Sequence, residues 1–203
     1  EVAFGAGSFN DTVWMIDGAS SAAGQATARW SYYAGEAVVS VRNFGDADGD
    51  GHDDVLAGVG DQGYKVLALS GGTASPSGSL LWQYPTTSSV YAVEVLPDLT
   101  GDGVDEALVG LWTTNGSAVR CLNGATGTLL WSSTQVAEYA MLLAPLQDVT
   151  GDGRPEVIVS SWENAVVLLD GATGAQVWKT PVGTLNGGDV WSARPIADLD
   201  GDG

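Results

Sequence analysis

The chain has 203 residues, 44% of them hydrophobic, which suits a folded domain and is too apolar for a disordered segment. Seven Lys and Arg against 25 Asp and Glu give a net charge of −18, which argues against nucleic acid and anionic membranes as partners. A single Cys and a single His exclude a disulfide framework, a cysteine zinc site and a two-histidine metal site. The composition therefore favours cations or neutral molecules as ligands.

Apolar runs in this sequence are short, and none approaches the roughly 20 residues that span a bilayer, so we expect no membrane insertion. Glycine accounts for 29 of the 203 residues, about twice its usual share. These glycines recur at fixed places and not in one low-complexity tract. The pattern indicates an internal repeat.

An acidic stretch recurs four times, and its first aspartates lie 52, 50 and 50 residues apart. The copies read DADGDGHDD at 46–54, DLTGDGVDE at 98–106, DVTGDGRPE at 148–156 and DLDGDG at 198–203. The sequence is thus built from repeats of about 50 residues.

The predicted elements follow the same order in every repeat. From the N-terminus come an apolar run at Glu1, a second run at Val13, a segment carrying Trp30 and a run over 38–44, after which the first acidic stretch begins. Later repeats place strands before the acidic stretches at 90–96, 141–147 and 191–197 and carry Trp82, Trp131 and Trp178 at one position, which follows an Asn-Gly or Asp-Gly turn for Trp131 and Trp178. Short runs rich in Val, Leu and Ala, bounded by Gly, Asp and Asn, predict strands buried on both faces.

Four short antiparallel strands per repeat of about 50 residues predict an all-β fold, the β-propeller, with one four-stranded blade per repeat. We expect one propeller over 1–203, with repeat units at about 1–36 (partial), 37–89, 90–137, 138–189 and 190–203 (partial). Three arrangements stay open. We favour a window onto a longer seven- or eight-bladed propeller. The others are a four-bladed ring closed by pairing of 190–197 with 1–7, and self-association through the same strand.

The acidic stretch, D-x-[D/T]-G-D-G-x-x-[D/E] followed by an apolar run, resembles the FG-GAP repeat of integrin-α-type propellers and their secreted microbial relatives. This resemblance covers essentially the whole chain. It implies a calcium-binding propeller at the cell surface or outside the cell.

The first acidic loop places carboxylates at alternate positions, which suits Ca²⁺, a cation that takes 6 to 8 oxygen ligands. A glycine at position 6 permits the sharp turn. An EF-hand would need Glu at position 12, but that position holds Ala57, Val109 and Val159 in predicted strands, so the ninth residue must close the site. The predicted ligands of the first loop are Asp46, Asp48, Asp50, the carbonyl of His52, and Asp54.

The other loops follow the same register. The second would use Asp98, Thr100, Asp102, the carbonyl of Val104 and Glu106, the third Asp148, Thr150, Asp152, the carbonyl of Arg154 and Glu156, and the fourth Asp198, Asp200 and Asp202. Thr at position 3 departs from the family pattern, which favours a water-bridged ligand and lower affinity there. The alternative is that all four are Asp-Gly turns without a metal.

Aromatic residues divide into two groups. Trp30, Trp82, Trp131 and Trp178 occupy one repeat position and are expected in the core, as is Cys121. Trp112 and Trp162 occupy another position, which other repeats fill with Gly, and they could either stack on sugar rings or cap the ends of blades. Glycosylation sequons occur at Asn10 and Asn115.

No paired carboxylates suited to glycoside hydrolysis emerge outside the acidic loops. The resemblance implies a secreted, calcium-binding module, not an enzyme, that serves adhesion or display by binding a protein or glycan. The alternative is the propeller domain of a polysaccharide-active enzyme similar to rhamnogalacturonan lyases. A quinone-dependent dehydrogenase, whose propeller blades carry a similar turn and Trp, is a third interpretation.

Overall fold

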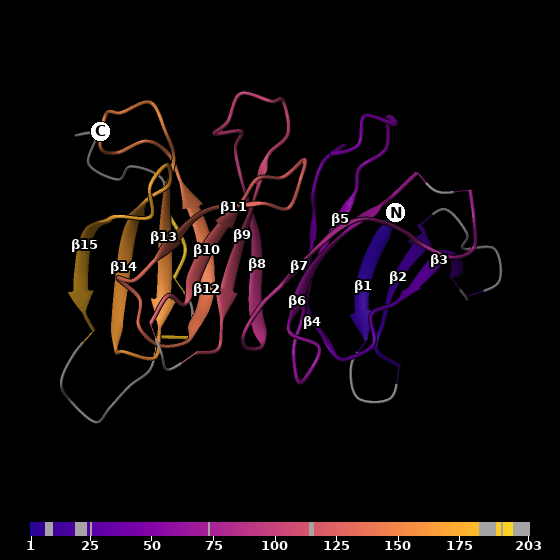
Figure 1. Cartoon of the computed structure of the whole chain (residues 1–203), viewed down its shortest axis with the longest axis horizontal. Coiled ribbons are helices and arrows are strands. Elements are labelled where there is room, and N and C mark those ends of the chain that lie inside the picture. Colours follow the sequence, from indigo (N-terminus) through magenta and orange to yellow (C-terminus); the bar gives the residue numbers. More distant parts are fainter. Residues whose placement is uncertain are drawn as a thin grey trace.

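A computed structural model describes residues 1–6, 10–18, 24, 26–72, 74–113, 116–182, 190–191 and 193–196. These residues form antiparallel sheets that stand side by side along the molecule (Figure 1). The strands are β1 (Val2–Ala6), β2 (Thr12–Asp17), β3 (Thr27–Tyr33), β4 (Val38–Asn43), β5 (Val55–Val59), β6 (Lys65–Ser70), β7 (Ser79–Pro85), β8 (Val90–Leu96), β9 (Glu106–Leu111), β10 (Val119–Leu122), β11 (Leu129–Ser133), β12 (Ala140–Leu146), β13 (Glu156–Ser161), β14 (Ala165–Asp170) and β15 (Gln176–Pro181).

Each sheet is a simple meander in which consecutive strands pair antiparallel. The second sheet (β4–β7), third sheet (β8–β11) and fourth sheet (β12–β15) have four strands, and the first sheet (β1–β3) has three. Strands β4, β8 and β12 lie next to one another, so the sheets fan out from this inner row. The arrangement confirms the predicted β-propeller of four-stranded antiparallel blades.

In the strand predicted over 191–197, the described residues 191 and 193–196 lie outside any strand. In the other repeats the equivalent strands β4, β8 and β12 each pair with the strand that follows the acidic loop. Among the described residues, no strand pairs with residues 190–191 and 193–196 in this way. Among the described residues, β1 pairs with β2 alone, and the pairing of 190–197 with residues 1–7 is not seen.

The core lies between the sheets. Strands β5, β9 and β13 are buried at every position, as predicted for strands covered on both faces. One apolar cluster joins Leu96 and Leu108 of the third sheet to Val157 and Leu169 of the fourth. The free thiol of Cys121 is buried in this cluster, and burial raises its pKa, which confirms its core position. Among the described residues no helix is long and apolar enough to cross a membrane.

Tryptophan side chains join each sheet to the next. The indole Nε1 of Trp82 donates to the carbonyl of Gly124 at 2.6 Å, and that of Trp131 donates to the carbonyl of Gly171 at 2.9 Å. Trp30 makes the same contact with Gly71, at 3.4 Å. Each acceptor glycine lies in the turn after the third strand of its own sheet, so one blade recognises the next through this turn.

Glycine is required where the indole rests on the turn. A Cβ at Gly174, where φ is +71°, would lie 2.5 Å from the Trp131 ring, and a Cβ at Gly127, where φ is +69°, would lie 2.7 Å from Trp82. Both the left-handed backbone and the close approach therefore exclude a larger residue.

Trp178 corrects the expectation that all four equivalent tryptophans are core residues. Trp30, Trp82 and Trp131 are buried, whereas Trp178 on β15 is 41% exposed. The physical reason is that, in the described part of the chain, no further sheet lies beyond the fourth to supply such a turn to Trp178.

Trp131→Phe should lower the free energy of unfolding by about 1–3 kcal/mol, because it leaves the buried carbonyl of Gly171 without its donor. Trp178→Phe is the matched control, since it occupies the same repeat position on an exposed strand, and it should change stability by less than about 0.5 kcal/mol. Chemical denaturation of both variants measures the difference. Equal losses would contradict a role for the indole hydrogen bond.

Candidate metal centres

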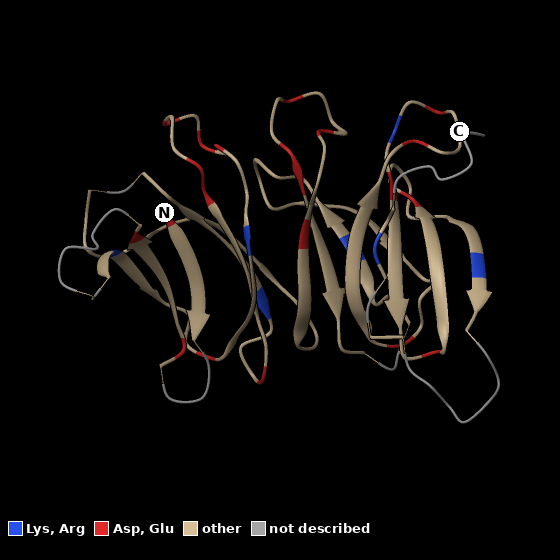
Figure 2. Ribbon diagram, turned by 180° about the vertical axis from the view of Figure 1, so that it is seen from behind, with Lys and Arg blue, Asp and Glu red and all other residues tan. Residues whose placement is uncertain are grey.

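Three loops that carry Asp and Glu project from the same edge of the sheets (Figure 2). They connect β4 to β5, β8 to β9 and β12 to β13. Because the sheets repeat the same topology, loops that are about 50 residues apart in sequence occupy equivalent places in space.

Backbone amides shape each loop around its first aspartate. In the second loop Asp98 accepts hydrogen bonds from Gly101 and Gly103 at 2.7 and 2.9 Å, and in the third Asp148 accepts from Gly151 and Gly153 at 2.7 and 2.8 Å. The glycines at position 6 have φ of +87°, +88° and +83° in the three loops, which confirms that this position needs glycine. The loop thus holds its side chains on the inside of the turn.

The second loop forms the most complete group. Asp98, Asp102 and Glu106 each offer a carboxylate oxygen, and these oxygens lie within 4.8 Å of one another. Glu106 is fully buried, and its Oε1 accepts from the amides of Leu99 and Thr100 at 2.7 and 3.0 Å. Its Oε2 is buried without any hydrogen-bond partner. A buried, unpartnered carboxylate oxygen beside two further carboxylates fits a cation and is costly without one.

The third loop repeats this arrangement. Oxygens of Asp148, Asp152 and Glu156 lie within the same 4.8 Å limit, and Glu156 is buried. The Thr150 hydroxyl donates to Glu156 Oε1 at 2.8 Å, so it is held inside the loop. Thr100 in the second loop instead receives a hydrogen bond from Asn123 at 3.3 Å.

The first loop differs in its closing residue. Asp46, Asp48 and Asp50 form a group, but all three are exposed and Asp54 is not one of its members. Asp54 is buried and accepts from the amides of Ala47 and Gly71 at 2.8 and 2.9 Å. Asp is one methylene shorter than the Glu of the other two loops, so its carboxylate reaches less far from β5 towards the loop.

The electrostatics of the groups combine two opposite trends. Burial raises the pKa of Glu106 and of Asp54, and nearby carboxylates raise both further. Backbone amides lower the pKa of Asp98 and Asp148 instead. The second loop therefore holds Asp98, whose ionised form is favoured, next to the buried Glu106, whose ionised form is disfavoured, and a divalent cation would favour the ionised form of both.

The remaining predicted ligands are placed as follows. The amides of His52, Val104 and Arg154, whose carbonyls are the predicted seventh ligands, each donate to the position 5 aspartate of their own loop at 2.8 or 2.9 Å. Asp198, Asp200 and Asp202 of the fourth loop lie outside the described residues, as does the sequon at Asn115.

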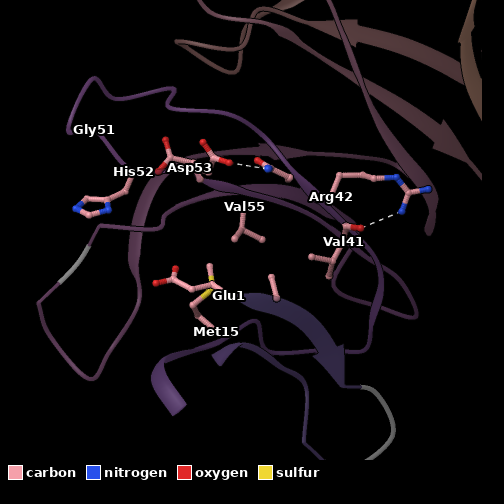
Figure 3. Close-up of a pocket in the computed structure, with 11 residues that line it drawn as sticks. Glu1, Met15, Val41, Arg42, Gly51, His52, Asp53 and Val55 are labelled. Carbon is pink, nitrogen blue, oxygen red and sulfur yellow. Dashed lines mark hydrogen bonds between the residues drawn. The ribbon is translucent and has the colours of Figure 1, made fainter. Parts of the chain in front are cut away.

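The His52 side chain borders a different feature, a cavity of about 490 Å³ between the first and second sheets (Figure 3). Apolar side chains such as Met15 and Val55 line the cavity beside Glu1 and Arg42. Arg42 is already paired with Glu94 at 3.0 Å. The cavity adds no ligand to the acidic group of the first loop.

Asn123 is a member of the second site that the loop motif does not predict. It lies in the turn after β10, is buried, and donates from Nδ2 to Asp102 Oδ2 at 2.7 Å. This hydrogen bond is the main cause that lowers the pKa of Asp102. The sequence offers one signal for this role: the turn carries Asn123, whereas the equivalent turn of the next repeat carries Asp170.

Comparison with known proteins agrees with this architecture. Residues 148–203 match the family described as FG-GAP-like repeat, so the chain carries such a repeat, and the resemblance inferred from the acidic loops is confirmed. The search of curated proteins finds no significant match.

Solved structures show the same fold. The chain is similar to BamB from Moraxella catarrhalis (23% identity, TM-score 0.57, 90% of this chain and 46% of that one). It is also similar to Sqt1 from Saccharomyces cerevisiae (19%, 0.63, 88% and 44%) and to the computationally designed Ika8 protein (15%, 0.58, 89% and 46%). The chain thus spans a little less than half the length of these proteins, and at such identities the likeness establishes the propeller fold alone.

Asn123→Ala should raise the pKa of Asp102 towards its ordinary value, because it removes the side-chain hydrogen bond that favours the ionised form. Carboxyl NMR titration of metal-free protein measures the shift, and Asp152 of the third loop, which has no such Asn in its turn, is the internal control. An unchanged Asp102 titration would show that the hydrogen bond is absent in solution.

Proposed function

We propose that the chain is a calcium-stabilised propeller module that binds a protein or glycan partner outside the cell and is not itself an enzyme. The observation that carries the calcium part is the unpartnered oxygen of Glu106, fully buried beside Asp98 and Asp102. The FG-GAP-like match over the third loop supports the same interpretation.

The donor set fits Ca²⁺ better than a transition metal. All side-chain donors are carboxylate or hydroxyl oxygens, and neither the single Cys nor the single His belongs to a described acidic group. When bound, Ca²⁺ would supply positive charge and additional oxygen coordination in each loop. The residues themselves do the positioning, since Asp98 and Asp148 order the backbone turns and Glu106 and Glu156 anchor the loops to buried strands.

A binding role is supported by the contacts of two acidic residues outside the loops, Glu94 and Glu163. Glu94 pairs with Arg42, and Glu163 pairs with Lys179 while accepting from the amides of Ala137 and Glu138. These carboxylates hold the scaffold together and are not held apart as an acid and a base. Propellers with such repeats mostly present surfaces for binding, and their rigid loops suit adhesion or display.

Calcium should raise the melting temperature strongly, because it offsets the repulsion among the clustered carboxylates. At a hundredfold excess over Kd, each occupied site adds about 2.7 kcal/mol. Thermal melts in millimolar calcium and in chelator measure the effect, and magnesium serves as the control cation. Coincident melts in calcium and chelator would overturn the calcium proposal.

Glu106→Gln should weaken calcium binding at the second site about tenfold or more, because it keeps the side-chain volume but removes a buried ligand charge. Thr100→Ala should weaken it less, since its hydroxyl is neutral and exposed. Glu138→Gln, at the opposite end of the sheets, is the matched control and should leave calcium affinity unchanged. Calorimetric titration gives the order, and equal effects of Glu106→Gln and Thr100→Ala would contradict it.

The rival function is the propeller domain of a polysaccharide-active enzyme of the rhamnogalacturonan-lyase kind. Its specific support is an arginine in an aromatic cavity, described below, which could face a uronate carboxylate. Incubation with pectic polysaccharide in calcium, followed by absorbance of unsaturated products, separates the two. Product formation by this chain would replace the binding proposal with the enzymatic one.

A further inference from the structure

Four aromatic rings gather at the end of the third and fourth sheets that lies away from the acidic loops. Trp112, which follows β9, has its ring centroid 4.8 Å from Tyr91, 4.6 Å from Tyr139 and 5.5 Å from Trp162. Tyr139 and Trp162 also pack edge to face at 4.6 Å. All four side chains are only partly buried, so the cluster remains accessible at the surface.

A cavity of about 510 Å³ opens beside this cluster. Trp112 and Tyr139 line one part, and Thr87, Ser88, Thr113 and Arg120 line the rest. The volume is within the range of small-ligand sites. Among its described lining residues there is no carboxylate, so the lining of this cavity is unlike that of the acidic loops.

Arg120 is the charged group of the cavity, and it makes no ion pair with any carboxylate in the described part of the chain. Its guanidinium donates to Tyr84 Oη at 3.2 Å and lies 5.8 Å from the centre of that ring, while its Nε is buried without a partner. The Ser88 hydroxyl is likewise buried and unpartnered. A partly buried cation without an anion is a costly arrangement that an anionic ligand would complete.

Hydrogen bonds fix the walls of the cavity before any ligand binds. The amide of Trp112 donates to the carbonyl of Ser89. Two more hydrogen bonds link this loop to the neighbouring one, from the amide of Gly116 to the carbonyl of Ala137 and from the amide of Tyr139 to the carbonyl of Thr113. Glu163 secures the 137–138 backbone from the fourth sheet. Preformed walls lower the ordering cost of binding.

We propose that this cavity binds a uronic acid residue of a glycan. Aromatic rings suit the C–H face of a pyranose, hydroxyls of Thr87 and Ser88 suit its hydroxyl groups, and Arg120 suits a planar carboxylate. The site rests on the proposed binding function and specifies one class of partner for it. In this proposal Trp112, which lines the cavity, stacks on the sugar ring. Trp162 packs behind Trp112 and caps the end of its blade.

Calorimetry in fixed saturating calcium tests the site with trisaccharides of galacturonic, glucuronic and mannuronic acid and with their carboxyl-reduced counterparts. At least one uronate should bind with Kd below about 1 mM, and its reduced form should bind at least about tenfold more weakly. Arg120→Gln should reduce uronate affinity about 10- to 100-fold, because the loss of a hydrogen bond to a charged group changes the binding constant by about this factor. Arg29→Gln, which makes the same charge change far from the cavity, should leave the affinity unchanged.

If none of the three uronates binds, if the reduced sugars bind equally well, or if affinity survives Arg120→Gln, the proposal is overturned. Should Arg120→Gln fail to fold, the discrimination by the unaltered protein and the behaviour of Arg120→Lys, which should weaken binding without abolishing it, still decide the question. Calcium melts of the same samples separate the two proposals. If calcium still stabilises the protein but no uronate binds, only the proposal of a uronate site is overturned. If uronate binds in an Arg120-dependent manner but calcium does not stabilise the protein, only the calcium proposal is overturned.

Discussion

The indole of one sheet resting on the glycine turn of the next is the contact on which the whole arrangement depends. It combines a buried hydrogen bond with an approach so close that Gly127 and Gly174 cannot carry a side chain. Because the turn belongs to the third strand of the next sheet, the contact sets both the spacing and the angle between sheets. The equivalent ends of all sheets are thereby brought to common edges, and this places the acidic loops together on one edge.

The acidic loops use the rigidity that these contacts create. Buried strands β9 and β13 begin with Glu106 and Glu156, so each closing carboxylate is held by a buried strand as well as by hydrogen bonds from its own loop. The first aspartate of each loop is then positioned by glycine amides. A loop alone would relieve repulsion by opening, but a loop pinned at its buried end must keep its carboxylates close. This constraint makes a cation the natural complement of the site.

Local repetition explains why most of the fold could be predicted from the sequence. A period of about 50 residues with apolar runs and Asp-Gly loops determines strand order, and the position 6 glycines adopt the predicted backbone. The failures concern residues whose state depends on a neighbouring element. Trp178 occupies the same repeat position as Trp131 but has no adjoining turn in the described part of the chain, where residues 191 and 193–196 also have no strand beside them.

The candidate sites divide in the same way. Ligands within nine consecutive residues could be inferred, whereas Asn123 contacts Asp102 from a turn 21 residues away. The aromatic cavity joins Ser88, Arg120 and Tyr139 from separate segments, so no single motif predicts it. The sequence singles out Trp112 and Trp162 only because two other repeats carry Gly at this position.

The overall charge of −18 opposes an anionic ligand, but the distance between the acidic loops and the cavity reduces this effect. Strand β9 has six residues, with Glu106 of the second acidic loop at one end and Trp112 directly after the other. At about 3.3 Å per residue, the two sites are separated by roughly 20 Å. The Debye length at physiological ionic strength is about 8 Å, so the acidic loops are largely screened from the cavity. Arg120 is the charged side chain that lines the cavity, so the proposed cation and glycan sites would lie at opposite ends of the same buried strand and would not compete.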